Sequence, residues 1–210
     1  MIEIIYKDED ILVCIKPTGV LSAEDSSGKP SLPSLLKEQL SLTDIYPVHR
    51  LDKEVSGLMV YALTQSAASV LSAEIADHTR FIKEYLCVVE GCPKDDTGFF
   101  EDLLFKDSSK NKSYVVKSLR RGVKKAKLQY TVLYKNEDIS LVRVRLFTGR
   151  THQIRVQFAS RKMPLIGDRK YGGRASEKVI ALFSCKLAFS HPTTKQPLCF
   201  EKNKEVSDMI

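Results

Sequence analysis

The sequence predicts a globular domain that contains both α-helices and β-strands. Its 210 residues are 43% hydrophobic and 28% charged, which is typical of a folded protein and argues against disorder or a fibrous repeat. Short segments rich in β-branched residues recur along the chain, and a few segments with the spacing of an amphipathic helix interrupt them. The chain shows no internal repeat and no long linker. We therefore expect one domain over residues 1–210.

The first 40 residues predict two strands and a helix. The strands are expected at 2–6 and 11–16, because both segments are rich in β-branched residues and flank an acidic turn. A loop at 22–31, which holds Ser, Gly, Asp and Pro, precedes a short helix around 34–40.

The next segments predict a strand, a helix and another strand. A strand at 58–63 is followed by a helix at 65–76, which the hydroxyl of Thr64 can cap. A further strand is expected at 82–90.

The C-terminal half predicts strands at 129–134, 140–147 and 180–189 and a helix at 151–159. Residues 106–127 hold nine Lys or Arg side chains and one acid, with only scattered apolar positions. A segment of this composition cannot pack in a core, so we expect a basic loop or an exposed hairpin there.

Charge is divided unevenly along the chain. Residues 1–105 carry 9 Lys/Arg and 18 Asp/Glu, whereas residues 106–210 carry 24 and 8, so that the net charge of +7 comes entirely from the second half. Such a basic half predicts a polyanionic partner that carries phosphates. The alternative is a solvated basic surface without a partner.

Several classes of protein are excluded or disfavoured. The first ten residues carry four acids, which is unlike a signal peptide, and no apolar run approaches the ~20 residues that span a bilayer. The five cysteines form no CxxC pair, and the four histidines are scattered. No hydrolase elbow, P-loop or dinucleotide-binding motif is present. We expect a cytoplasmic monomer without a metal or cofactor.

The densest polar cluster of the acidic half is 48–58, which contains His49, Arg50 and Asp52 just before a predicted strand. Loops that enter a scaffold strand often carry functional residues. A carboxylate there can act as nucleophile or general base if a cation keeps it ionised. The alternative is a turn in which Asp52 pairs with a neighbouring Lys or Arg.

A matching cluster at 148–156 lies in the basic half. In a helix that begins near Thr151, Thr151 and Arg155 share a face, so that Arg155 could reach a buried carboxylate while Arg150 meets phosphate. His152 could donate a hydrogen bond at the helix start, as could its neighbour Gln153. The alternative is an exposed amphipathic helix with ordinary surface arginines.

Lys83 and Tyr85 share one face of the strand at 82–90, because side chains alternate along a strand. Tyr85 is by default a core aromatic residue. Beside an ionised Asp it could instead stack on a base.

Taken together, these motifs resemble the RluA-type RNA pseudouridine synthases over nearly the whole chain. The matching segments are 11–20 with its Lys-Pro-x-Gly end, 49–58 with His-Arg-Leu-Asp, 83–91 with Lys-x-Tyr, 149–156 with Gly-Arg-Thr-His-Gln-Ile-Arg-Val, and 166–172 with Gly-Asp-x-x-Tyr-Gly. Five motifs in the right order make the resemblance specific.

The resemblance implies an α+β pseudouridine synthase fold, with a central, mostly antiparallel mixed sheet and flanking helices and loops. Asp52 would be the catalytic aspartate, and Arg155, rather than Arg150, would pair with its carboxylate. Arg50 would enter the RNA as the target uridine flips out, and Tyr85 would pack on the flipped base. The sequence departs from the family at Val55, which is usually Thr, and at residues 183–184, where His-Ala is common.

The resemblance also implies an RNA substrate, ribosomal or transfer RNA or both. Because the first motif begins near residue 11, we expect no N-terminal RNA-binding domain of the S4 type, and target choice would fall on the catalytic domain. The basic insertion at about 106–127 is the candidate for that role, with Lys124, Lys125 and Lys127 among its phosphate contacts, beside Lys83, Arg150 and His152 elsewhere.

Two other functions remain open. A catalytically silent RNA-binding or ribosome-assembly protein could keep the same fold and basic surface. A hydrolase could use Asp52 with His49, three residues away, as an acid and base pair.

Overall fold

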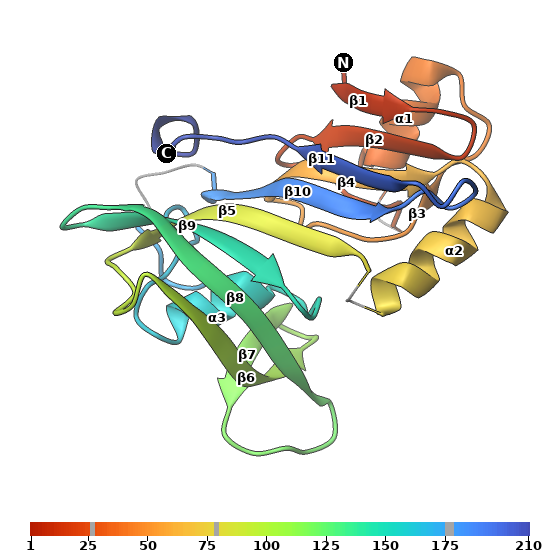
Figure 1. Ribbon diagram of the computed structural model, residues 1–210. Coiled ribbons are helices and arrows are strands. Elements are labelled where there is room, and N and C mark those ends of the chain that lie inside the picture. The colour runs from red at the N-terminus through yellow and green to blue at the C-terminus, as the bar shows by residue number, and fades with distance from the viewer. Residues whose placement is uncertain (26–27, 78–79, 175–178) are drawn as a thin grey trace. The chain divides into compact units, whose positions relative to one another are not determined.

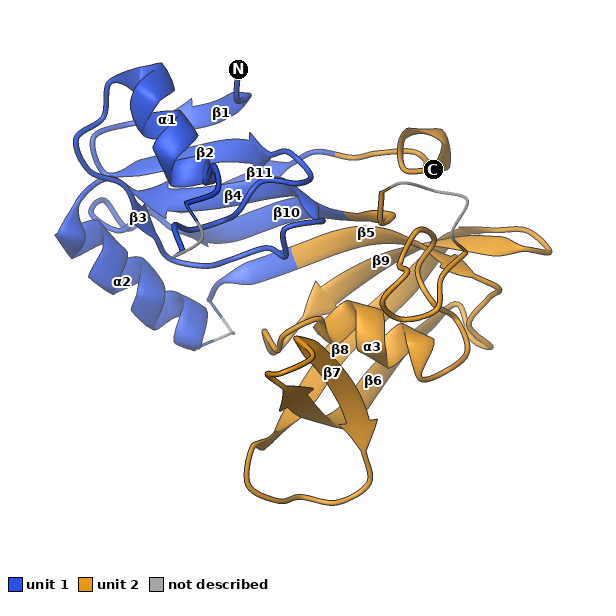
Figure 2. Cartoon of the chain, turned by 180° about the vertical axis from the view of Figure 1, so that it is seen from behind, with its two compact units in different colours: residues 1–83, 183–202 blue, residues 84–182, 203–210 orange. Residues whose placement is uncertain are grey.

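The computed structural model describes residues 1–25, 28–77, 80–174 and 179–210, and the chain forms two compact units (Figure 2). Unit 1 comprises residues 1–83 and 183–202, and unit 2 comprises residues 84–182 and 203–210. Part of the predicted loop at 22–31, and one of the four histidines, His78, lie outside the described residues.

Unit 1 is built on a mixed sheet in the order β1-β2-β4-β10, with β3 paired to β4 and β11 to β10 (Figure 1). All its pairs are antiparallel except β4 with β10. Its strands are β1 (Ile4–Lys7), β2 (Ile11–Lys16), β3 (Tyr46–Pro47), β4 (Ser56–Ala62), β10 (Leu182–Ser190) and β11 (Pro197–Glu201), and its helices are α1 (Leu32–Leu40) and α2 (Gln65–Ala76).

The helices of unit 1 begin where side chains can bind their free N–H groups. Thr64 Oγ1 accepts a hydrogen bond from the N–H of Ala67 (3.1 Å), which confirms the predicted cap of α2. Ser31 caps α1 in the same way, so that α1 starts two residues earlier than predicted. Ala67 and Leu71 of α2 are buried in one apolar cluster with the alternate residues of β2 and β4.

Unit 2 contains antiparallel strands in the order β5-β9-β8-β6-β7, with one helix, α3, packed on them (Figure 1). Its elements are β5 (Ile82–Glu90), β6 (Thr97–Asp107), β7 (Lys112–Val116), β8 (Val123–Lys135), β9 (Ile139–Leu146), α3 (Gln153–Ala159) and a short 3-10 helix, Val206–Asp208. Phe158 of α3 packs edge-on against Phe100 and Tyr130, with ring centroids 5.0 and 6.2 Å apart. These contacts anchor the helix to β6 and β8.

The basic segment at 106–127 is an exposed hairpin, one of its two expected forms. It contains the end of β6, all of β7 and the first residues of β8. The strand β6 is missing from the sequence prediction because most of its residues are exposed or half-buried, so it lacks the apolar pattern of a core strand. For the same reason β8 begins six residues earlier than the predicted 129–134.

The start of α3 differs from the prediction. The helix begins at Gln153 and not at Thr151, because His152 adopts a left-handed conformation with φ of 53°. Thr151 therefore lies outside the helix, and the expectation that it shares a helical face with Arg155 is wrong.

Gly57 is the residue on which the pairing of β4 with β10 depends. Its φ is +121°, and a Cβ atom would lie 2.4 Å from the backbone N and O of Ser184. We expect Gly57→Ala to lower the free energy of unfolding by about 3 kcal/mol or more, because backbone strain and a clash with main-chain atoms add. Urea denaturation followed by circular dichroism measures this.

Gly19→Ala is the matched control for that prediction. Gly19 also has a positive φ, of +81°, but no atom lies within 4 Å of the Cβ position. Gly19→Ala should lower the free energy of unfolding only by the backbone strain, roughly 1 kcal/mol. Equal losses in the two variants would contradict the account of the β4–β10 contact.

Candidate active site

Asp52 lies in the loop between β3 and β4 of unit 1, and its neighbours fix this loop. Leu51 and Val55 are buried on either side of the half-buried aspartate. The hydroxyl of Ser22 accepts from the N–H of Leu51 (3.0 Å) and donates to its carbonyl (2.7 Å). The N–H of Val55 donates to the carbonyl of Asp52 (3.0 Å), which closes a tight turn. The carboxylate is thus presented from a well-held backbone.

Lys16 is a fully buried cation beside this loop. Its Nζ donates to the carbonyls of Pro17 (2.9 Å) and Lys53 (3.0 Å), which ties the end of β2 to the Asp52 turn. Burial lowers the pKa of Lys16 to about 8, while the negative charge of Asp52 opposes this shift and favours the ammonium form. The sequence analysis did not single out Lys16, although a lysine that ends an apolar strand is the signal that could have found it.

His49 is held as a neutral ring. Its Nε2 accepts from the N–H of Val60 (3.1 Å), its Nδ1 is buried, and its ring packs at 5.9 Å from the ring of Phe81. Burial and the nearby charge of Lys83 lower the pKa of His49 to about 3. Such a ring cannot exchange protons near neutral pH, which argues against the hydrolase that would pair it with Asp52. Arg50, the next residue, is exposed.

Arg155 in unit 2 forms a buried, bidentate ion pair with Asp168. The Nε of Arg155 donates to Asp168 Oδ2 (2.7 Å) and its Nη2 donates to Oδ1 (2.8 Å), with side-chain exposures of 2% and 0%. The guanidinium carbon lies 5.4 Å from the centre of the Tyr171 ring. Neither Asp168 nor Tyr171 was named as a site residue, although both lie in the Gly-Asp-x-x-Tyr-Gly motif.

The turn before α3 is held by the side chain of Gln153. Its Oε1 accepts from the N–H of Arg150 (3.0 Å) and from the hydroxyl of Thr148 (2.7 Å), and its Nε2 donates to the carbonyl of Lys127 (3.1 Å). Arg150 itself donates from Nε to the carbonyl of Lys125 (3.0 Å). His152 is buried, and its Nδ1 lies 2.9 Å from the hydroxyl of Tyr171.

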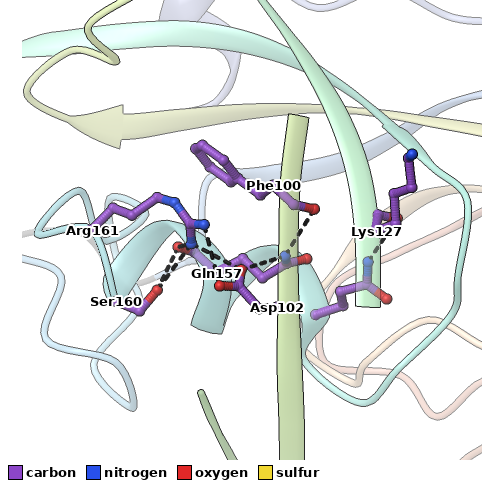
Figure 3. Close-up of polar contacts among 7 residues, drawn as sticks. Phe100, Asp102, Lys127, Gln157, Ser160 and Arg161 are labelled. Atoms are coloured by element: carbon purple, nitrogen blue, oxygen red, sulfur yellow. Dashed lines mark hydrogen bonds and ion pairs between the residues drawn. The ribbon is translucent and has the colours of Figure 1, made fainter. Parts of the chain in front are cut away.

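A second Arg–Asp pair is formed by Arg161, which lies two residues after the end of α3. Arg161 binds Asp102 through Nη1 (2.9 Å) and Nη2 (3.2 Å), and Gln157 donates to the same carboxylate (2.7 Å), as Figure 3 shows. The guanidinium of Arg161 lies 3.9 Å from the centre of the Phe100 ring. Unlike Arg155, Arg161 keeps 30% of its side chain exposed.

The two candidates on β5 are both buried. Tyr85 is 6% exposed and lies opposite Val144 of β9. The ammonium of Lys83 lies 5.7 Å from the centre of the Phe81 ring, and burial lowers the pKa of Lys83. The two side chains have the same burial, as the predicted alternation requires.

The three candidate lysines at the start of β8 are exposed. Lys127 forms an ion pair with Glu101 (2.6 Å) and lies 5.1 Å from the centre of the Phe99 ring. Lys124 and Lys125 are adjacent on the strand, where successive side chains point to opposite faces.

The structure places these candidates in both units. Asp52, Arg50 and Lys83 belong to unit 1, whereas Tyr85, Arg150, His152, Arg155 and the three lysines belong to unit 2. Among the described residues, no group of His, Cys, Asp or Glu side chains could hold a metal ion. No helix of the described chain is long and apolar enough to cross a membrane.

The buried Lys16 should make the free energy of unfolding depend on pH. Its pKa is about 8 in the folded chain and 10.5 in a model compound, so the unfolded chain binds more protons between these values. The free energy of unfolding therefore gains a contribution as the pH rises through this window. Lys16→Met should lack this gain and should be less stable near pH 7 by about 1–3 kcal/mol, because two carbonyls lose their donor.

Urea denaturation of both proteins at pH 7.5 and 9.5 checks this, because their difference cancels the other titrating groups. Stability curves that stay parallel across the two pH values would contradict the burial of a charged Lys16.

The chain matches the family described as "RNA pseudouridylate synthase" over residues 10–160. It is 36% identical to an "Uncharacterized RNA pseudouridine synthase" of Aquifex aeolicus, with 95% of this chain and 68% of the relative covered. It is 32% identical, with the same coverage, to "Ribosomal large subunit pseudouridine synthase D" of Zymomonas mobilis.

The fold is similar to that of the solved structure "Human RNA Pseudouridylate Synthase Domain Containing 1", with a TM-score of 0.80 at 22% identity and coverage of 97% of this chain and 84% of that one. This likeness confirms the predicted α+β pseudouridine synthase fold. Together with the sequence matches, it shows that the chain belongs to the RNA pseudouridylate synthase family and is an RNA pseudouridine synthase.

Proposed function

We propose that the protein converts specific uridines of structured RNA, ribosomal or transfer RNA or both, to pseudouridine, and that Asp52 is the catalytic residue. The observation that carries the assignment is the pairing of charges in unit 1. A half-buried carboxylate stands on an immobilised turn, and its negative charge favours the ammonium form of the buried Lys16 beside it. A solvated surface aspartate would need neither the anchored loop nor a buried cation.

The chemistry requires an ionised group and no cofactor. Pseudouridine forms when the C–N glycosidic bond breaks, the uracil turns and a C–C bond forms from C5 to the sugar. The N1 position gains a proton and C5 loses one, so that no net oxidation or hydrolysis occurs. An aspartate and well-placed cations are sufficient for this rearrangement.

We assign supporting roles to other residues from the family motifs. By these motifs, Arg155 has a supporting role in the chemistry of the aspartate, and Tyr85 packs on the target base. Arg50 fills the RNA stack when the uridine flips out, a step that costs a few kcal/mol and must be offset by contacts with the backbone. Its exposure in unit 1 suits such an insertion. Lys83, Arg150 and His152 contribute to RNA binding.

The exposed basic hairpin supports a role in holding the RNA backbone. Several of its cations already contact protein groups: Lys112 lies 5.0 Å from the centre of the Tyr171 ring, and Arg120 lies 5.2 Å from that of Phe105. The exposed Lys124 and Lys125 are the cations best suited to phosphate. We therefore propose that the hairpin sets affinity more than the rate of the chemical step.

The direct test is to incubate the protein with total RNA from a strain that lacks it and to map pseudouridine at nucleotide resolution. New pseudouridines at defined sites would support the proposal. RNA binding without any new pseudouridine would favour a silent binding protein on the same fold.

Asp52→Asn should abolish pseudouridine formation and leave folding and RNA affinity nearly unchanged. The amide keeps the shape of the side chain and removes the negative charge that the reaction needs. Glu54→Gln, an equal change at an exposed carboxylate two residues away, should keep full activity. Turnover of Asp52→Asn within tenfold of the parent protein would contradict the assignment.

Neutralising Lys124, Lys125 and Lys127 together with Gln should weaken RNA binding and leave the turnover of saturated enzyme largely unchanged. Each phosphate contact that is lost flattens the dependence of log K on log salt by ~0.7 to 0.9. We expect a change of about two units, and up to about three if Lys127 exchanges Glu101 for phosphate. The slope of log K against log salt is measured by titrating salt into the complex of each protein with an RNA transcript in which the parent forms pseudouridine.

A control with the same change in charge replaces Lys7, Lys29 and Lys195, which are exposed on unit 1. This triple variant should retain the parent slope. If both triple variants bind RNA with the same affinity at every salt concentration, the hairpin is a solvated surface and the RNA binds elsewhere on the protein.

A further inference from the structure

The helix α3 is unusual because residues 153 to 158 are all buried although three of them are polar. Each polar side chain has its own partners: Gln153 binds the preceding turn, Gln157 binds the backbone and carboxylate on β6, and Arg155 binds Asp168. Of the three, only Arg155 carries a charge. A buried guanidinium is costly unless its geometry and partners are well matched.

The turn that carries Asp168 is shaped by glycines. A Cβ atom at Gly167 would lie 2.1 Å from the carbonyl oxygen of Val179, and one at Gly173 would lie 2.1 Å from that of Leu165. Gly167 also has a φ of +74°, which L side chains rarely adopt. The carbonyl of Asp168 accepts from the N–H groups of Tyr171 (3.1 Å) and Gly173 (2.9 Å). This turn therefore fixes the backbone of Asp168 and Tyr171 together.

Tyr171 adds a second constraint on the same guanidinium. Its ring lies beside Arg155, and its hydroxyl accepts from the N–H of Ser113 (2.8 Å). The hydroxyl hydrogen can then be donated to Nδ1 of His152 (2.9 Å), the residue that precedes α3. Burial raises the pKa of Tyr171 to about 12, so the hydroxyl keeps its hydrogen at neutral pH.

We propose that Asp168 is a positioning residue of the pseudouridine synthase reaction, which fixes the orientation of the Arg155 guanidinium with the help of Tyr171. Asp168 binds the edge formed by Nε and Nη2 through two hydrogen bonds, so it fixes the plane and the direction of the guanidinium. This inference rests on the proposed function, because it assigns the orientation that the role of Arg155 requires.

The experiment compares the parent chain with Asp168→Asn on the RNA transcript in which the parent forms pseudouridine. The transcript carries tritium at C5 of uridine, which is released because C5 exchanges hydrogen for carbon. We expect kcat to fall on the order of 100-fold, as for a reacting group displaced by about 1 Å, while KM for the transcript stays within about twofold. A purely structural role would instead lower the amount of folded protein, which circular dichroism measures.

Asp102→Asn is the matched control. It removes the same kind of bidentate partner from Arg161 in the same unit, and it should leave kcat unchanged. If Asp168→Asn does not fold, Asp168→Glu replaces it, because it keeps the charge and moves the carboxylate by one methylene. The same fall in kcat is expected.

A double-mutant cycle tests whether Asp168 acts through Arg155. Arg155→Met alone should lower kcat, and adding Asp168→Asn should lower it no further. Equal losses from Asp168→Asn with and without Arg155 would overturn the inference, as would a folded Asp168→Asn protein with kcat within threefold of the parent. Failure of the proposed function is a different result: the parent chain itself would then form no pseudouridine.

Discussion

The buried ion pair between Arg155 and Asp168 is the interaction on which the arrangement of unit 2 depends. Removing a guanidinium and a carboxylate from water costs several kcal/mol for each ion, and only close, bidentate geometry can offset that cost. The pair is accordingly almost inaccessible to solvent, and its two hydrogen bonds measure 2.7 and 2.8 Å. The ion pair is held in place by the close packing of α3, by the turn between Gly167 and Gly173 and by the ring of Tyr171.

Unit 1 also contains a buried cation that is held by hydrogen bonds, but its partners differ. The ammonium of Lys16 is fully buried, and backbone carbonyls rather than a carboxylate accept its hydrogen bonds. Burying a charged group costs free energy that a hydrophobic residue would not cost, and hydrogen bonds to the cation only partly offset it. Buried cations that stability does not require are expected at functional sites, where they adjust the charge of a reacting group. The position of Lys16 beside the Asp52 turn agrees with that expectation.

The sequence predicts best what depends on local patterns. The strand at 82–90 and the helix at 65–76 were predicted with their observed ends, because β-branched residues and a Thr64 cap mark them locally. β6 was missed, since its residues are exposed on a twisted hairpin and carry no apolar period. Asp52 and Arg155 could be named from motifs. Lys16 and Asp168 lie in matched motifs as well, but their roles could not be predicted, because these roles follow from contacts with residues 37 and 13 positions away in the chain.

The two kinds of cation in this protein have different freedom, and this difference suits different tasks. Arg155 is confined to one orientation, so no side-chain entropy remains to be lost when it acts on a reacting group. Lys124 and Lys125 are exposed on a hairpin and retain many rotamers, which allows them to follow an irregular phosphate backbone at modest cost for each contact. Substitutions of Lys124 and Lys125 are therefore expected to change RNA affinity without disturbing Arg155. The charge of the C-terminal half is thus divided between a rigid, buried group, which suits the role proposed for Arg155, and an adaptable, solvated surface, which suits the proposed binding of RNA.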